Sequence, residues 1–190
     1  MTHIAVISMM GQYNHLIARR VLQLGCNATL VFDSSWLTDH REYDGVIIGG
    51  GPARAPLLPE SFLSKFRVFL REYNGPILGI CLGHQAIARA LGGVVEEALR
   101  PEYGPMTVEV IKENELFKGF PRKFKAWMSH NDEVVSLPLG FKHLARSDMC
   151  KIQAMGSSEG KIYGVQFHPE VEHTEYGLKL FKNFLNLVKR

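Results

Sequence analysis

Short apolar runs alternate with amphipathic stretches through the first half of the chain, and this alternation constrains the fold more than any other feature. The apolar runs predict buried strands over 4–7, 28–32, 45–48 and 76–80. Between and after them, apolar residues recur at helical spacing over 14–24, 61–73 and 83–91. Strands that alternate with helices in this order predict right-handed crossovers and a mainly parallel sheet with helices on both faces.

The second half of the chain has a different pattern. Apolar and polar residues alternate over 106–111, 124–128 and 161–167, which predicts half-exposed, antiparallel strands. A last helix is expected over 175–188, with Thr174 as its N-cap. The prediction is a three-layer α/β fold with a mixed, mainly parallel central sheet, flanking helices and a smaller antiparallel part. No repeat or linker-like stretch divides the sequence, so we expect a single domain over residues 1–190.

Composition excludes several classes of function. The net charge of +3 comes from scattered Lys and Arg residues, which does not indicate nucleic-acid binding. No apolar run approaches the roughly 20 residues of a membrane helix, and the first residues do not resemble a signal peptide. The three cysteines do not make a disulfide framework and are expected to be reduced thiols. We therefore expect a cytoplasmic protein with no membrane partner.

The segment Gly79–Gly83 has a glycine on either side of a central cysteine, two positions away in each direction, and it joins a predicted strand to a predicted helix. This is the pattern of a nucleophile elbow, in which a sharp, strained turn presents the nucleophile at the start of a helix. The helix N-terminus favours the thiolate form of Cys81. The alternative is a buried structural cysteine. The strand, the glycines and the helix together favour a nucleophile.

A cysteine nucleophile needs a base, and His168 is the candidate because Glu170 follows two residues later. In an extended segment these two side chains project to the same side, and Pro169 restricts the backbone between them. The carboxylate would orient the imidazole, as in a catalytic triad. The alternative is a surface His–Glu pair at the end of a strand.

The glycine cluster Gly49–Gly51 ends the third predicted strand, next to Pro52. Its backbone can approach an oxyanion closely, so the N–H groups of Gly51 and Leu82 are the candidates for an oxyanion hole. A phosphate-binding loop is disfavoured because the chain has no G-x-x-x-x-G-K-[ST] pattern. A plain turn is the remaining alternative.

Other histidines and cysteines are not expected to take part in the chemistry. His168, Glu170 and His173 match no familiar zinc spacing, so no metal site is predicted. His84 lies on the first turn after the elbow and is expected to point away from the thiol. Cys26 and Cys150 lack the elbow context of Cys81 and are expected to be structural or incidental.

The segments Gly79–Gln85 (GICLGHQ) and Phe167–Glu170 (FHPE) resemble the class I glutamine amidotransferases, and the resemblance covers nearly the whole chain. It implies a flavodoxin-like α/β sandwich and a triad of Cys81, His168 and Glu170. It also implies that Gln85 and the backbone around Ser129, His130 and Asn131 hold L-glutamine.

Three further segments resemble the amidotransferase of GMP synthases: 11–20, 127–134 and 168–174. The sequence has no SGGxDS loop of the ATP-pyrophosphatase, so it resembles the separate glutaminase subunit found in archaea. This implies that the partner is a synthetase subunit, which binds ATP and Mg²⁺, and that this chain itself holds no cofactor.

Two alternatives remain open on the same residues. Anthranilate and aminodeoxychorismate synthases have related amidotransferases, although these usually carry Ser where this chain has Val171. A regulatory module without catalysis could use the same fold. The presence of Cys81, His168 and Glu170 together favours an enzyme.

Overall fold

The computed structural model describes residues 1–37 and 42–189. Its strands are β1 His3–Ile7, β2 Asn27–Val31, β3 Gly45–Ile48, β4 Ile77–Ile80, β5 Val94–Val110, β6 Lys123–Ser136, β7 Phe141–Arg146, β8 Ala154–Ser157 and β9 Ile162–Val165. Its α-helices are α1 Asn14–Gln23, α2 Glu60–Glu72, α3 Leu82–Ala90 and α4 Gly177–Val188, with short 3₁₀ turns at Ser34–Leu37 and Ala55–Leu57. The strands form one nine-stranded sheet in the order β2-β1-β3-β4-β9-β8-β7-β5-β6.

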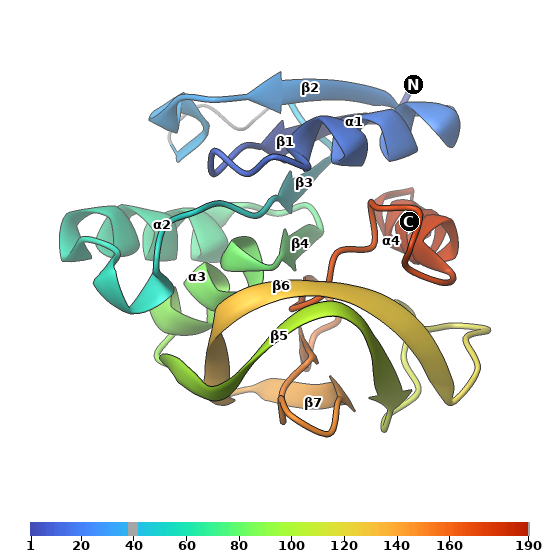
Figure 1. The fold of residues 1–190 in the computed structure, drawn as a ribbon. Coiled ribbons are helices and arrows are strands. Elements are labelled where there is room, and N and C mark those ends of the chain that lie inside the picture. Colours follow the sequence, from blue (N-terminus) through green and yellow to red (C-terminus); the bar gives the residue numbers. More distant parts are fainter. Residues whose placement is uncertain (38–41, 190) are drawn as a thin grey trace.

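The first part of the sheet is parallel and is covered on both faces. Strands β2, β1, β3, β4 and β9 run in the same direction. Alternate residues of β1 face opposite layers: Ile4 and Val6 pack with α1 and α4, whereas Ala5 and Ile7 pack with α2 and α3. The helices therefore form two outer layers around the sheet, as Figure 1 shows. This is the mixed α/β architecture that the sequence predicted.

The second part of the sheet is antiparallel. Strands β5 and β6 form a long antiparallel pair, and β7 and β8 connect this pair to β9. In Figure 1, β5 and β6 arch together over the lower half of the molecule. The pairing of β5 with β6 shifts register between Glu97 and Glu102, so residues 98–101 bulge out of the ladder.

One sequence expectation is wrong in part and another is wrong. The alternation over 161–167 predicts a half-exposed, antiparallel strand; β9 does pair antiparallel with β8, but it is fully buried and also pairs parallel with β4. Its apparent alternation comes partly from Gly164, whose missing side chain leaves room for the ring of His84. Thr174 does not cap the last helix; the cap position belongs to Tyr176, in a left-handed conformation. β7 and β8 were not predicted, because neither has a strong periodic pattern.

The parallel strands β1, β3, β4 and β9 all end at the same edge of the sheet. This edge carries the loops that follow Ile7, Ile48, Ile80 and Val165. Ligands of open α/β sheets bind outside the carboxyl ends of the strands. The elbow cysteine and the predicted His–Glu pair both lie in these loops. None of the helices in the described residues is long and apolar enough to cross a membrane.

Candidate active site

The turn between β4 and α3 has the geometry of a nucleophile elbow. Cys81 has φ 54° and ψ −108°, a conformation that a residue with a side chain rarely adopts. A Cβ atom on Gly79 would lie 2.6 Å from the carbonyl carbon of Gly83, and one on Gly83 would lie 2.2 Å from the carbonyl oxygen of Ile48. Both glycines are therefore required by close backbone approaches, as the sequence pattern indicated.

His168 and Glu170 lie in the loop after β9 and form a buried pair. Nδ1 of His168 is 2.6 Å from Oε1 of Glu170, and the two residues are 5% and 1% exposed. The backbone of His168 is fixed on both sides: its N–H donates to the carbonyl of Trp127 at 3.0 Å, and its carbonyl accepts from the Thr174 hydroxyl at 2.6 Å. The ring consequently has one defined orientation.

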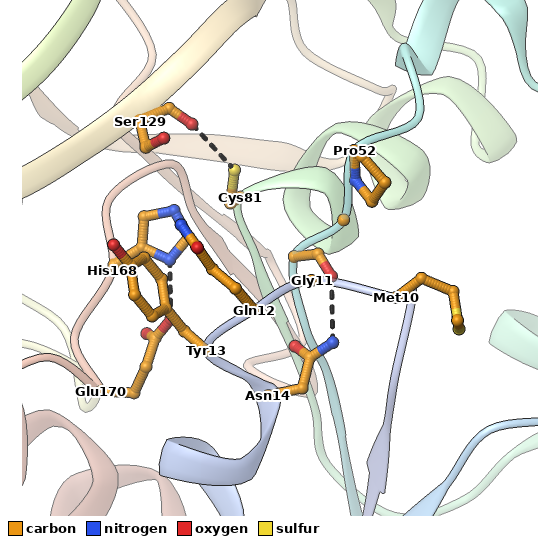
Figure 2. A pocket seen from close by; sticks show the side chains of 12 residues that line it. Met10, Gly11, Gln12, Tyr13, Asn14, Pro52, Cys81, Ser129, His168 and Glu170 are labelled. Carbon is orange, nitrogen blue, oxygen red and sulfur yellow. Dashed lines mark hydrogen bonds and ion pairs between the residues drawn. The ribbon is translucent and has the colours of Figure 1, made fainter.

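The His168 ring lies near Cys81 as well as against Glu170 (Figure 2), and its Nε2 has no hydrogen-bond partner among the described residues. Burial lowers the pKa of His168, but the negative charge of Glu170 and the interactions with Cys81 and Glu170 outweigh it, so the pKa lies well above its usual value. A Cβ atom on Gly50 would lie 3.4 Å from Cε1 of His168 and 3.5 Å from Cβ of Cys81. The structure thus brings the predicted thiol, imidazole and carboxylate together.

A cavity of about 310 Å³ opens over these residues. It is lined by Met10, Gly11, Gln12, Tyr13, Asn14, Gly50, Gly51, Pro52, Cys81, Ser129, His168 and Glu170. Figure 2 shows the side chains around it. Tyr13 contacts the His168 ring edge to face, with ring centroids 5.3 Å apart. Sequence reasoning assigned no site role to the loop 10–14, although its place after the first strand of a parallel sheet was a usable signal.

The glycine cluster Gly49–Gly51, which carries one of the two candidate oxyanion donors, is held close to the elbow. A Cβ atom on Gly51 would lie 1.9 Å from the carbonyl oxygen of Met9, so only glycine fits there. Asn14 Nδ2 donates to the carbonyl of Gly50 at 3.1 Å and fixes the loop. Leu82 is the first residue of α3, where a backbone N–H has no partner within the helix. Gly51 lines the cavity and Leu82 directly follows Cys81 in the chain, and their role as oxyanion donors remains a prediction.

Gln85 does not reach the cavity with its side chain. Its Nε2 donates to the carbonyl of Asp132 at 2.7 Å and to Oε1 of Gln166 at 3.0 Å, and the residue is 4% exposed. It is not among the residues that line the cavity. In this structure Gln85 joins α3 to β6 and to the loop after β9, so a direct contact with substrate stays a prediction.

The segment Ser129–Asn131 passes the cavity as part of β6. Ser129 lines the cavity, and its carbonyl is 3.7 Å from the Cys81 sulfur. Asn131 is exposed, and its Oδ1 accepts from the Tyr103 hydroxyl at 2.8 Å. His130 is 5% exposed and does not line the cavity. The prediction that the backbone of this segment contacts a ligand remains untested. Ser129 is the residue of the segment that is placed to make such a contact.

Arg54 ties the loop after β3 to β6. Its Nε lies 2.9 and 2.8 Å from the two carboxylate oxygens of Asp132, and its Nη2 also contacts that carboxylate. Nη2 is also 3.2 Å from Glu97 Oε2. Asp132 is 4% exposed, so Arg54 neutralises a buried charge. This ion pair, called the clamp below, connects the loop after β3, which carries Gly49–Gly51, to β6, which carries Ser129. Nothing in the local sequence pattern predicted it.

The residues that were not expected to be catalytic lie away from the cavity. His84 is fully buried, and burial lowers its pKa to about 3, so the ring is neutral. Cys26 and Cys150 are free, buried thiols. The His173 ring packs at a tilt against Trp127, with ring centroids 4.9 Å apart.

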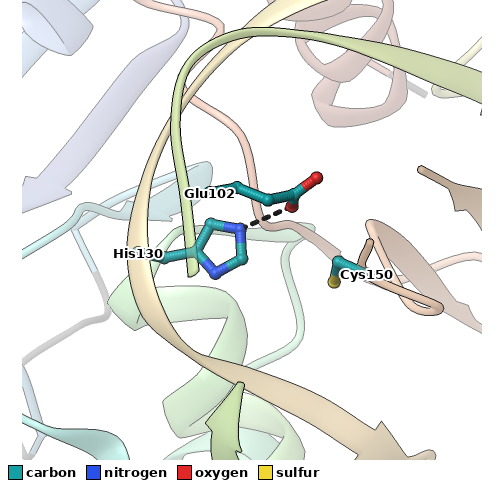
Figure 3. A group of neighbouring side chains, drawn as sticks. All are labelled: Glu102, His130 and Cys150. Atoms are coloured by element: carbon teal, nitrogen blue, oxygen red, sulfur yellow. Dashed lines mark hydrogen bonds and ion pairs between the residues drawn. The ribbon is translucent and has the colours of Figure 1, made fainter. Parts of the chain in front are cut away.

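One buried group in the described part of the chain has the residue types of a metal site. It consists of Glu102, His130 and Cys150, whose ligand atoms all lie within 4.8 Å of one another (Figure 3). It is distinct from the group around Cys81, and sequence reasoning did not find it because its members come from β5, β6 and the loop after β7.

A cysteine on an elbow, beside a buried imidazole that a carboxylate orients, has the parts of a nucleophile with its base. The sheet of this protein places the cysteine, the imidazole and the carboxylate at the carboxyl ends of its parallel strands. The sequence matches the family "Glutamine amidotransferase class-I" over residues 5–188, and the chain belongs to this family.

Two relatives and one solved structure show which members of the family this chain resembles. A glutamine-hydrolyzing GMP synthase subunit of Sulfolobus acidocaldarius is 45% identical over 188 residues, which cover 98% of this chain and 99% of that protein. The protein of the same name from Pyrococcus furiosus is 45% identical over 93% of this chain and 94% of its own. The crystal structure of a putative GMP synthase subunit from Thermoplasma acidophilum superposes with a TM-score of 0.90 at 36% identity, covering 100% of this chain and 94% of the other.

Proposed function

We propose that this chain is the glutaminase subunit of a GMP synthase. It hydrolyses L-glutamine to glutamate and ammonia, and a separate ATP-pyrophosphatase subunit uses the ammonia to convert XMP to GMP. The observation that carries the hydrolytic part is the buried group of Cys81, His168 and Glu170 under one cavity. The relatives named as glutamine-hydrolyzing GMP synthase subunits match this chain over nearly their whole length, which supports the pairing with a synthetase subunit.

The first half of the proposed mechanism forms a thioester. The Cys81 thiolate attacks the side-chain amide carbon of glutamine, and the developing oxyanion accepts hydrogen bonds from the N–H groups of Gly51 and Leu82. Each such donor contributes about 3 kcal/mol to transition-state stabilisation. The raised pKa of His168 favours the protonated ring, which can protonate the leaving nitrogen as ammonia departs.

The second half hydrolyses the thioester. His168, now neutral, accepts a proton from water as the oxygen attacks the γ-glutamyl carbon. Collapse of the tetrahedral intermediate expels the Cys81 thiolate and releases glutamate, while His168 keeps the proton. Glu170 holds Nδ1 of His168 and therefore presents the other ring nitrogen to the reacting atoms in both steps.

The proposal requires no cofactor in this subunit. ATP and Mg²⁺ belong to the partner, where adenylation of XMP prepares the ring carbon for attack by ammonia. The expected location is the cytoplasm, together with that partner. We further propose that the partner activates the glutaminase, because hydrolysis without ammonia transfer wastes glutamine.

The alternatives differ in the partner, so the test varies the partner. The purified chain is mixed with an ATP-pyrophosphatase subunit of GMP synthase or with a chorismate-utilising synthase subunit, and glutamate and product are measured. The proposal expects glutamine-dependent GMP formation in the first mixture and no coupled product in the second. Coupling to the chorismate enzyme would replace the proposed partner, and an absence of glutamate release in every mixture would favour a module without catalysis.

A further inference from the structure

β6 presents alternate side chains to opposite sides where it passes the cavity. Ser129 lines the cavity, whereas the His130 side chain is buried on the other side of the strand. Nδ1 of His130 is 3.0 Å from the carbonyl oxygen of Asp132, and Nε2 is 2.8 Å from Oε2 of Glu102. Both ring nitrogens therefore face oxygen atoms, and the ring is held at both of its polar positions.

Glu102 is fully buried, and three polar side chains contact its carboxylate. Its Oε1 accepts from the Ser147 hydroxyl at 2.6 Å, and its Oε2 accepts from Gln153 Nε2 at 2.5 Å in addition to the contact with His130. Figure 3 shows the carboxylate directed at the His130 ring. A buried carboxylate that accepts several hydrogen bonds is held rigidly, and the loss of one member leaves the others unpaired.

A metal ion is a second reading of this group, because Cys150 lies beside it. Hydrogen bonds from Ser147 and Gln153 and the contact with His130 already surround the Glu102 carboxylate, which leaves little room for a metal ion to bind it. The group is better described as a hydrogen-bonded His–Glu pair.

The pair lies where the backbone ladder is interrupted. Glu97 pairs with Asp132 and Glu102 pairs with His130, so residues 98–101 leave the β6 segment without regular partners at Asn131. An interrupted ladder restrains the strand less than a regular one does. The side-chain pair from Glu102 to His130 supplies a restraint at the residue that follows Ser129.

We propose that Glu102 is a positioning residue for glutamine binding. Through His130 it fixes the backbone of Ser129–Asn131 against the cavity, without touching the substrate or the reacting atoms. This inference rests on the proposed function, since it takes glutamine as the ligand of the cavity. It predicts that the loss of Glu102 weakens glutamine binding while the chemistry at Cys81 continues.

The test compares Glu102→Ala with wild type in the complex with the synthetase subunit, following glutamate release directly. We expect E102A to raise the KM for glutamine about tenfold, as for the loss of one buried hydrogen-bond partner. The kcat and the fraction of chains that iodoacetamide alkylates at Cys81 should stay near the wild-type values. A general structural defect would instead lower kcat and the alkylated fraction together.

Conservative variants provide the controls. Oε1 of Gln153 has no hydrogen-bond partner, so its amide can turn to accept from an amide at position 102, and Glu102→Gln should restore most of the affinity. Cys150→Ala changes the same group without breaking the pair and should keep the wild-type KM. Should E102A fail to fold, Glu102→Asp shortens the carboxylate by one methylene and should give a smaller rise in KM.

The inference is overturned if E102A, or E102D in its place, has the wild-type KM. It is also overturned if C150A matches E102A and both lose a metal ion that elemental analysis finds in the wild type. Because glutamate is measured directly, a chain that hydrolyses glutamine for a different synthase still tests the role of Glu102. A wild type that releases no glutamate would refute the proposed function and this inference together.

Discussion

Glu170 holds the imidazole of His168 through a hydrogen bond of 2.6 Å, and both side chains are buried beside the Cys81 thiol. The buried carboxylate does two things at once: it fixes the ring orientation, and its charge raises the pKa of the imidazole against the opposing effect of burial. The proton supply for the leaving ammonia therefore depends on this pair.

Glu170→Gln should lower the rate of glutamate release by about 10²–10⁴, because an amide neither stabilises the imidazolium nor fixes its tautomer as well. Removing the negative charge also lowers the pKa of His168. The basic limb of the pH–rate profile, which reports loss of the His168 proton, should therefore move to lower pH. Rates measured from pH 5 to 10 in the complex check this. An unchanged basic limb would show that another group controls it.

Two glycines near the thiol should respond differently to a methyl group. Gly83→Ala places a Cβ atom 2.2 Å from a backbone oxygen, so the fold must adjust, at a cost of about 1–3 kcal/mol. Gly50→Ala places its Cβ atom at ordinary contact distance, 3.4 Å from His168 and 3.5 Å from Cys81. We expect G83A to lose thermal stability. We expect G50A to keep its thermal stability but to lose activity. Equal melting temperatures for G83A and wild type would contradict the elbow geometry.

The clamp between Arg54 and Asp132 should matter for substrate binding. Arg54→Ala leaves a buried carboxylate without its cation and releases the glycine loop from β6, so the KM for glutamine should rise. Arg54→Lys should not restore it fully, since lysine cannot contact both carboxylate oxygens in the same way. Arg122→Ala, which removes an exposed partner of Glu109, is the matched control. Equal effects of R54A and R122A would argue against the clamp.

Local features of this protein were predictable from sequence, and distant pairings were not. The elbow at Cys81 and the pair His168–Glu170 each lie within a few residues, so the chain order alone carries their geometry. The contacts of Arg54 with Asp132 and of Glu102 with His130 join residues 78 and 28 positions apart. No periodicity predicts such pairs, because they depend on how segments distant in the sequence pack together.

Tertiary structure also overrode two local signals. Thr174 has the residue type of an N-cap, but its hydroxyl donates to the carbonyl of His168 and accepts from the N–H of Trp127 at 2.9 Å. The alternation over 161–167 resembled a half-exposed strand, but β9 lies in the centre of the sheet between β4 and β8. In both cases the residues support the loop that carries His168.

The central claim is that Cys81 releases ammonia from glutamine for a partner subunit, and the variant Cys81→Ala tests it most directly. GMP formation is measured in the complex with the ATP-pyrophosphatase subunit, once with glutamine and once with ammonium chloride as the nitrogen source. We expect C81A to abolish the glutamine-dependent reaction and to leave the ammonia-dependent reaction at the wild-type rate. Glutamine-dependent synthesis by C81A at the wild-type rate would show that Cys81 is not the nucleophile.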